Sequence, residues 1–212
     1  MKLYSYWRSS TSYRARIALN LKGVKYDYIP VNILQGEQTN PEFLKLNPMG
    51  GVPTIVDGGH VIGQSLAIMD YLEQTRPNPA LLPADPAARA YVWQLALIVA
   101  CDVHPLVNMP AVNYVSALAG DSEKLPWIQY FTSAGLNAIE YLLANNKFAG
   151  KYCCGDAPTL ADVCLVPQMY AAKRFEVDVT NYPNINRIND LCLQHPAFAA
   201  AHPDEQIDAV KS

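Results

Sequence analysis

A proline-rich segment divides this sequence into two parts that differ in their hydrophobic pattern. Residues 76–86, Arg-Pro-Asn-Pro-Ala-Leu-Leu-Pro-Ala-Asp-Pro, contain four prolines in eleven positions. Because proline fixes φ and has no backbone N–H, neither a helix nor a central strand can continue through this segment. We predict one domain over residues 1–80, a linker at residues 81–86 and a second domain over residues 87–212.

Strand and helix signals alternate before the linker. The predicted elements are strand 2–6, helix 13–22, strand 26–33, helix 41–46, strands 52–56 and 60–62, and helix 66–74. The first strand–helix–strand unit requires parallel pairing, whereas Asp57-Gly58-Gly59 predicts an antiparallel hairpin. This βαβαββα order predicts an α/β domain with a small mixed sheet and helices on its faces.

Only helix signals follow the linker, so we predict an all-α second domain. Its helices are expected at residues 87–103, 125–143, 160–174 and 185–193. Cys101, Cys164 and Cys192 lie in apolar runs and are predicted to be small core residues.

Composition narrows the class of protein. Of 212 residues, 50% are hydrophobic and 17% charged, which excludes wholesale disorder, and a net charge of −3 does not favour nucleic acid as a partner. The longest apolar run, Leu95 to Cys101, is too short for a membrane span, and the first eight residues are too polar for a signal peptide. Five cysteines without C-x-x-C spacing predict neither a disulfide framework nor a metal site. We expect a cytoplasmic globular protein.

Four hydroxyl residues, Ser9-Ser10-Thr11-Ser12, follow Arg8 at the first strand-to-helix junction. A helix cap explains one of them. A helix amino terminus also favours an anion, by roughly 0.3–1 kcal/mol when exposed and up to ~2 kcal/mol when partly buried. Lowering a thiol pKa by two from its usual ~8.5 needs about 2.7 kcal/mol, which the helix end and one or two hydroxyl donors can supply. The junction is therefore either a cap or a thiolate site.

Two later segments also have both a structural and a ligand-binding interpretation. Pro53 begins a predicted strand, and a cis peptide there would leave the Val52 N–H and C=O free for a peptide-like ligand. Ser65 is expected to cap the next helix, where Gln64 and Ser65 form either an ordinary cap or a carboxylate site.

Three other segments have structural explanations. Thr159 and Asp162 form a capping box, so Asp162 is not predicted to be catalytic. Pro105 would kink or end a helix beside His104, and a histidine there is either structural or a ligand. Arg174 lies near the carboxyl end of its helix, where a cation is favourable without any substrate.

Taken in order, the motifs resemble the zeta class of glutathione transferases, which includes maleylacetoacetate and maleylpyruvate isomerases. Residues 8–19, RSSTSYRARIAL, resemble the Ser-Ser-Cys-Ser-x-Arg-x-Arg-Ile-Ala-Leu motif of that class. The resemblance continues at residues 46–54, 64–68, 159–162, 165–168 and 174–180, and so extends over essentially the whole chain.

The resemblance implies a glutathione transferase fold, with a thioredoxin-like first domain that binds glutathione, and a homodimer. It implies that Ser10 donates to the glutathione sulfur with support from Ser9 and Thr11. Val52, before a cis Pro53, would pair with the cysteinyl backbone.

The resemblance also assigns the remaining site residues. Gln64 and Ser65 would hold the γ-glutamyl carboxylate, and His104 and Asn108 would line the glutathione site. Arg8 and Arg174 would bind the carboxylates of a small unsaturated dicarboxylate.

The implied reaction is cis–trans isomerisation of maleylacetoacetate to fumarylacetoacetate by reversible thiol addition, in tyrosine and phenylalanine catabolism. Three departures bear on it: Thr11 replaces a cysteine, Gly50-Gly51 replaces a pair such as Lys-Gln, and Met109-Pro110 is neutral where some maleylpyruvate isomerases are basic. The alternatives are a maleylpyruvate isomerase, a general glutathione transferase that conjugates electrophiles, and a non-enzymatic interaction module.

Overall fold

The computed structural model describes residues 1–210, which form two compact units. Unit 1 comprises residues 1–80 together with residues 194–210, and unit 2 comprises residues 81–193. Residues 194–210 are predicted to belong to the second domain, but in the structure they pack with unit 1. Polar contacts hold them there, because Arg16 Nε and Asn20 Nδ2 donate to the carbonyls of Ala201 and Ala197, each at 3.0 Å.

Unit 1 is built on a four-stranded mixed sheet with strand order β2-β1-β3-β4. Strand β1 is parallel to β2 and antiparallel to β3, and β3 is antiparallel to β4. The predicted element order and pairing are therefore confirmed. The elements are β1 (Lys2–Ser5), α1 (Ser10–Leu21), β2 (Asp27–Pro30), η1 (Glu37–Thr39), α2 (Pro41–Leu46), β3 (Thr54–Asp57), β4 (His60–Gly63), α3 (Ser65–Thr75), α10 (Pro196–Ala201) and η4 (Pro203–Glu205).

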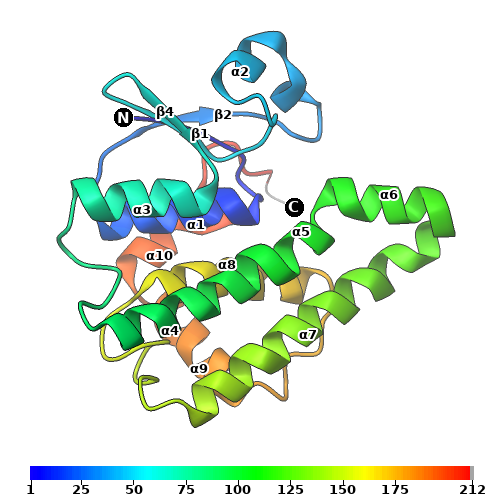
Figure 1. Ribbon diagram of the computed structural model, residues 1–212. Coiled ribbons are helices and arrows are strands. Elements are labelled where there is room, and N and C mark those ends of the chain that lie inside the picture. Colours follow the sequence, from blue (N-terminus) through cyan, green and yellow to red (C-terminus); the bar gives the residue numbers. More distant parts are fainter. Residues whose placement is uncertain (211–212) are drawn as a thin grey trace. The chain divides into compact units, whose positions relative to one another are not determined.

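Helices α1 and α3 lie side by side against one face of the sheet (Figure 1). A buried ion pair joins them, in which Lys22 Nζ lies 2.6 Å from Glu73 Oε2 and also donates to the carbonyl of Pro79 at 2.6 Å. Gly23, at φ +64°, follows the α1 cap and ends the helix. The two helices and the chain that leaves α3 are thus fixed at one point.

Unit 2 is helical throughout, as predicted. Its elements are α4 (Pro86–Leu97), the π-helical η2 (Ile98–Val103), α5 (His104–Val107), α6 (Met109–Ala119), η3 (Asp121–Glu123), α7 (Lys124–Asn145), α8 (Leu160–Arg174) and α9 (Pro183–Leu193). Helix α6 is not among the predicted helices. Its large apolar side chains do not all lie on the buried face, because Tyr114 and Leu118 are exposed. Its start signal is present in the sequence: Asn108 accepts from the Ala111 N–H at 3.1 Å, and Pro110 follows.

The predicted linker belongs to unit 2 rather than forming free chain. Leu81 and Leu82 are 2% and 4% exposed, and the Leu81 carbonyl accepts from the Leu160 N–H at 2.9 Å. The prolines end the preceding helix, while the two leucines between them are drawn into the helical core.

The predicted helix 87–103 changes winding at Ile98, where the π-helical segment η2 begins. Val99 and Val103 occupy its buried positions, so Cys101 is exposed and its predicted core placement is wrong. Taken together, residues 86–107 are long and apolar enough to cross a membrane by length and composition, with mean hydropathy 1.5. Within unit 2, however, α4 packs against α8 and η2 packs against α7, as expected of core helices.

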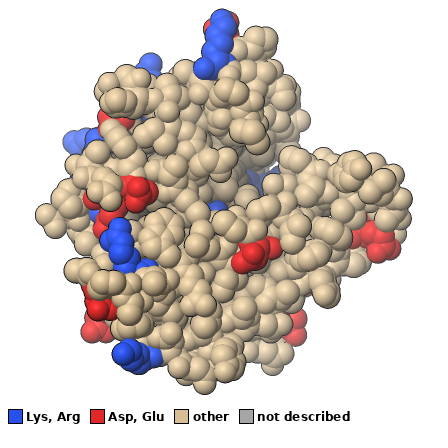
Figure 2. All heavy atoms as spheres, in the orientation of Figure 1, with Lys and Arg blue, Asp and Glu red and all other residues tan. Residues whose placement is uncertain are grey.

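Charged side chains are scattered over the face of the molecule drawn in Figure 2. Basic and acidic residues alternate there between larger areas formed by uncharged residues. This face therefore presents no continuous basic stripe of the kind that follows a phosphate backbone.

Gly135 in α7 provides a test of the packing around η2. A Cβ atom at this position would lie 2.1 Å from Val103 Cγ2. We expect Gly135→Ala to lower the free energy of unfolding by about 1–3 kcal/mol, because the clash lies in a packed core. Chemical denaturation measures the loss, and the double variant Gly135→Ala/Val103→Ala should recover part of it. Equal stability of Gly135→Ala and the wild type would contradict this packing.

Candidate active site

The junction between β1 and α1 is held by the hydroxyl residues that the sequence singled out. Ser9 is the N-cap of α1, and its Oγ accepts from the Ser12 N–H at 3.2 Å. One hydroxyl is thus a helix cap, which is the simpler of the two interpretations. The first turn of α1 contains no acidic residue, so nothing within it neutralises the helix amino terminus.

The hydroxyls of Ser9 and Thr11 form a directed chain that ends at the Val52 carbonyl. Thr11 Oγ1 lies 2.9 Å from the Val52 carbonyl oxygen and 2.9 Å from Ser9 Oγ. A carbonyl only accepts, so Thr11 gives its single proton to Val52, and Ser9 must then donate to Thr11. Within residues 1–210 the Ser10 hydroxyl has no recorded partner. Its proton can therefore be donated to a bound group without breaking this chain.

Val52, whose carbonyl accepts the Thr11 hydrogen bond, lies in the segment between α2 and β3. The Val52–Pro53 peptide is cis, as the resemblance implies. The expectation that both backbone groups of Val52 are free is wrong for the carbonyl, which accepts from Thr11. Asn47 Nδ2 shapes the segment by donating to the Gly51 carbonyl at 2.8 Å and to Thr54 Oγ1 at 3.0 Å.

The two glycines that depart from the family pattern differ in their surroundings. Gly50 has φ +58°, and a Cβ there would lie 3.1 Å from the Gln38 carbonyl oxygen. A Cβ at Gly51 would meet nothing within 4 Å. Position 50 therefore favours glycine for conformational reasons, whereas position 51 has room for the side chain that it lacks.

The start of α3 lies next to this segment. Gly63 pairs with Thr54 in the β3–β4 register, so Gln64 follows directly beside Pro53. The N-cap is Gln64 and not Ser65 as predicted, because Ser65 is already the first helical residue. Gln64 makes no side-chain cap and has φ +64°, a conformation that is strained for a residue other than glycine. The first turn of α3 has no acidic side chain either, so its N–H groups can receive a carboxylate.

Arg8 lies between the strand and the cap. Its guanidinium carbon is 5.1 Å from the centre of the Trp7 ring, and Trp7 itself is buried. A cation over an aromatic face is attracted to it and loses some of its freedom. This contact restricts the Arg8 side chain at the position directly before the Ser9 cap.

The three remaining predicted residues lie in unit 2. His104 begins α5 directly after η2, and Asn108 uses its side-chain oxygen to cap α6. Arg174 is the last residue of α8, with its guanidinium 4.5 Å from the Phe175 ring centre. The grouping of these three residues with Ser10 is a prediction from the family resemblance.

Asp162 has the structural role predicted for it. It is fully buried and accepts from the Cys153 N–H at 2.8 Å and from the Thr159 N–H and hydroxyl, each at 2.7 Å. Burial raises the pKa of this carboxyl, while these hydrogen bonds lower it. The capping box is present at the start of α8, and its acid is enclosed by the fold.

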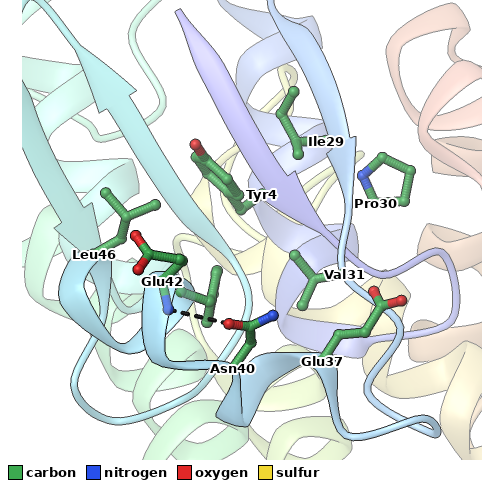
Figure 3. Close-up of a pocket in the computed structure, with 9 residues that line it drawn as sticks. Tyr4, Ile29, Pro30, Val31, Glu37, Asn40, Glu42 and Leu46 are labelled. Carbon is green, nitrogen blue, oxygen red and sulfur yellow. Dashed lines mark hydrogen bonds between the residues drawn. The ribbon is translucent and has the colours of Figure 1, made fainter.

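A cavity of about 360 Å³ lies elsewhere in unit 1, between β2 and α2 (Figure 3). Its walls include Tyr4, Ile29, Val31, Phe43 and Leu46. None of the predicted site residues lines it. Within residues 1–210, no group of three or more His, Cys, Asp or Glu side chains could hold a metal ion.

Sequence reasoning did not find two residues that shape this junction. Arg16 is buried and donates to the Trp7 carbonyl at 2.9 Å and to Ser5 Oγ at 3.2 Å. Asp208 accepts from the Trp7 N–H at 3.1 Å. Arg16 lies in the motif at residues 8–19, but Asp208 has no local signal in the sequence.

Comparison with known proteins places this geometry in a family. Residues 1–74 match the family model described as the glutathione S-transferase, N-terminal domain, so unit 1 has the thioredoxin-like fold of that domain. A zeta-class glutathione S-transferase from Euphorbia esula is 48% identical over 99% of this chain and 92% of its own length. A maleylacetoacetate isomerase from Pseudomonas aeruginosa is 47% identical over 98% of each chain.

Solved structures agree with these relatives. The holo structure of a maleylpyruvate isomerase, a bacterial zeta-class enzyme, has a TM-score of 0.96 and 45% identity, and the match covers 99% of this chain and 100% of the other. A maleylacetoacetate isomerase from Methylobacterium extorquens AM1, with bound malonate and glutathione, has a TM-score of 0.96 and 39% identity over 100% of both chains. The chain belongs to the zeta-class glutathione transferase family.

The contact between Thr11 and Val52 can be tested through stability. We expect Thr11→Val to lower the free energy of unfolding by about 1 kcal/mol, because it leaves the Val52 carbonyl without this donor. Thr11→Ser keeps the hydroxyl and should retain most of the stability. Chemical denaturation of both variants gives the comparison, and equal losses in the two would contradict the hydrogen bond.

Proposed function

We propose that this protein is a glutathione-dependent isomerase that converts maleylacetoacetate to fumarylacetoacetate. The observation that carries the proposal is the β1–α1 junction, where a helix amino terminus without an acidic side chain begins at Ser10, two residues after Arg8. Similarity to maleylacetoacetate isomerases over nearly the whole chain supports it. The proposal includes a cytoplasmic homodimer that acts in tyrosine and phenylalanine catabolism.

The residues of unit 1 fit glutathione by the chemistry of their donors. Ser10, with support from Ser9 and Thr11, holds the sulfur at the start of α1. The Val52 N–H, before cis Pro53, pairs with the cysteinyl backbone. Gln64, Ser65 and the first N–H groups of α3 hold the γ-glutamyl carboxylate. His104 and Asn108 complete the glutathione site from unit 2.

When bound, glutathione supplies a thiolate that adds reversibly to the cis double bond, so that the bond can rotate before the thiol leaves. The protein must keep the sulfur ionised at neutral pH, where an ordinary thiol with a pKa near ~8.5 is mostly protonated. The amino terminus of α1 and the Ser10 hydroxyl both favour the negative charge. The thiol proton passes to solvent, and the anion that remains is stabilised by these donors.

Arg8 and Arg174 orient the substrate by binding its carboxylates. A guanidinium presents parallel N–H donors that match a carboxylate, which restricts both its position and its rotation. Holding two ends of a short dicarboxylate places the alkene near the sulfur and reduces the entropy lost at the reacting step. The same charges favour the enolate that addition creates.

Maleylpyruvate is the second candidate substrate, because a zeta-class maleylpyruvate isomerase matches this chain over its full length. The two substrates share a cis double bond and a carboxylate, so the same donors suit both. Met109 and Pro110, at the start of α6, offer no charge there, which favours maleylacetoacetate.

A substrate assay with arginine variants tests the reaction type. We expect turnover of maleylacetoacetate only when glutathione is added, and a loss of kcat/KM of about 10- to 100-fold in both Arg8→Ala and Arg174→Ala. Lys173→Ala, which removes an exposed cation beside Arg174, is the matched control and should behave like the wild type. Full isomerase activity in both arginine variants would exclude this role, and conjugation of electrophiles without isomerisation would favour a general transferase.

The thiolate is tested separately by titrating bound glutathione. We expect Ser10→Ala to raise the pKa of the bound thiol by about 1–2, because one hydrogen bond to a charged sulfur is lost. Ultraviolet absorbance of the thiolate measures the pKa, with Ser122→Ala as a surface control. A thiol pKa that is the same in Ser10→Ala and the wild type would show that Ser10 does not contact the sulfur.

A further inference from the structure

Residues 194–210 return to unit 1 after the helices of unit 2, and we call them the return segment. Helix α10 packs on α1, and η4 follows it. Gln206 Nε2 then fastens the chain by donating to the carbonyls of Ala200 at 3.1 Å and His202 at 2.8 Å. The Ala209 N–H donates to the Gln206 carbonyl at 3.0 Å and closes a turn around Asp208. Asp208 is therefore held in place within its own segment.

Each carboxylate oxygen of Asp208 accepts one hydrogen bond from unit 1. Oδ2 accepts from the Trp7 backbone N–H at 3.1 Å, and Oδ1 accepts from the Tyr28 hydroxyl at 2.7 Å. These partners are separated from Asp208 by 201 and 180 positions in the sequence. The contact joins β2, the β1–α1 junction and the return segment at one carboxylate.

Trp7 is fixed from both sides by these contacts. Its N–H donates to Asp208, and its carbonyl accepts from Arg16 at 2.9 Å. The peptide groups before and after Trp7 therefore cannot rotate independently. The Trp7 ring in turn supports the Arg8 guanidinium at 5.1 Å, and the chain continues into the α1 cap at Ser9.

The negative charge of Asp208 lies near the buried positive charge of Arg16. The recorded acceptors of the buried Arg16 guanidinium are neutral oxygens of Ser5, Tyr6, Trp7 and Ala201. Burial lowers the pKa of Arg16, and the nearby Asp208 carboxylate acts against that effect. Asp208 thus stabilises the charged form of the side chain that holds the other side of Trp7.

We propose that Asp208 is a positioning residue for the active site, which orients Arg8 toward a substrate carboxylate by fixing Trp7. This inference rests on the proposed function, because it gives Arg8 a dicarboxylate to bind. The side-chain contacts of Asp208 are to Trp7 and Tyr28, so its role is to act through Trp7. Its effect should therefore appear in binding of the dicarboxylate far more than in binding of glutathione.

The variants are Asp208→Ala, Asp208→Asn and Tyr28→Phe, with Asp204→Ala as the control. Asp208→Ala removes both hydrogen bonds, whereas an asparagine can accept from Trp7 through its oxygen and donate to the Tyr28 oxygen. Asp204 lies in the same segment but is 66% exposed and makes no recorded contact outside that segment. The probes are malonate, bound in the presence of glutathione, and maleylacetoacetate.

In Asp208→Ala we expect about tenfold weaker malonate binding by calorimetry and about tenfold lower kcat/KM, mainly through KM. Hydrogen exchange of the Trp7 amide should rise at least about tenfold, while exchange at Ile55 in β3 stays as in the wild type. Glutathione affinity should change by less than about twofold. Asp208→Asn should recover most of the loss, Tyr28→Phe should show a smaller one, and Asp204→Ala should match the wild type.

Two results would overturn the proposal. One is a Trp7 amide that stays protected in Asp208→Ala, and the other is faster exchange with unchanged malonate binding and turnover. If Asp208→Ala does not fold, Tyr28→Phe gives the same comparison with one bond removed. A wild-type protein that binds malonate without turning over maleylacetoacetate would contradict the proposed function alone, because the exchange and binding measurements still judge Asp208.

Discussion

The architecture of unit 1 depends on the hydrogen bonds that the buried Arg16 guanidinium donates. It donates to the Trp7 carbonyl at 2.9 Å within the β1–α1 junction and to the Ala201 carbonyl at 3.0 Å in the return segment. Only an arginine offers several donors in fixed directions, so one side chain on α1 defines the path of two chain segments that are distant in the sequence. Removing it would leave buried carbonyls without partners, which costs more than the hydrogen bonds contribute. The path of the β1–α1 junction is therefore determined by Arg16, a side chain of the helix that follows it.

Much of this fold follows from local signals in the sequence. The strand–helix–strand unit and the Asp57-Gly58-Gly59 hairpin are sufficient to predict which strands pair and in which direction, and the structure confirms both. Helix α8 begins and ends where its apolar spacing and capping box predict. These features depend on backbone geometry within a few residues, which is why a single sequence reveals them.

The errors arise where a distant contact decides the outcome. Cys101 lies in an apolar run, but the π-helical winding of η2 turns it to the surface. A cis peptide at Pro53 predicts a free Val52 carbonyl, yet Thr11 donates to it across 41 positions in the sequence. Serine is a preferred N-cap residue, so Ser65 is the predicted cap of α3. In the structure Gln64, at φ +64°, is the N-cap and the helix starts at Ser65. Asp208 shows the same limit most clearly, since its partners lie in the first 28 residues.

Two buried cysteines of this chain are not suited to supply the thiolate that the proposed reaction needs. Burial raises the pKa of the Cys153 and Cys192 thiols, and the Asp162 carboxylate raises them further, so neither forms a thiolate near neutral pH. Thr11 stands where the family motif has a cysteine, and its hydroxyl is committed to Val52. A second ionisable sulfur at the start of α1 would compete for the same helix terminus and donors. With threonine at this position, the first turn of α1 has no ionisable sulfur of its own, which agrees with the proposal that its amino terminus stabilises the thiolate of bound glutathione.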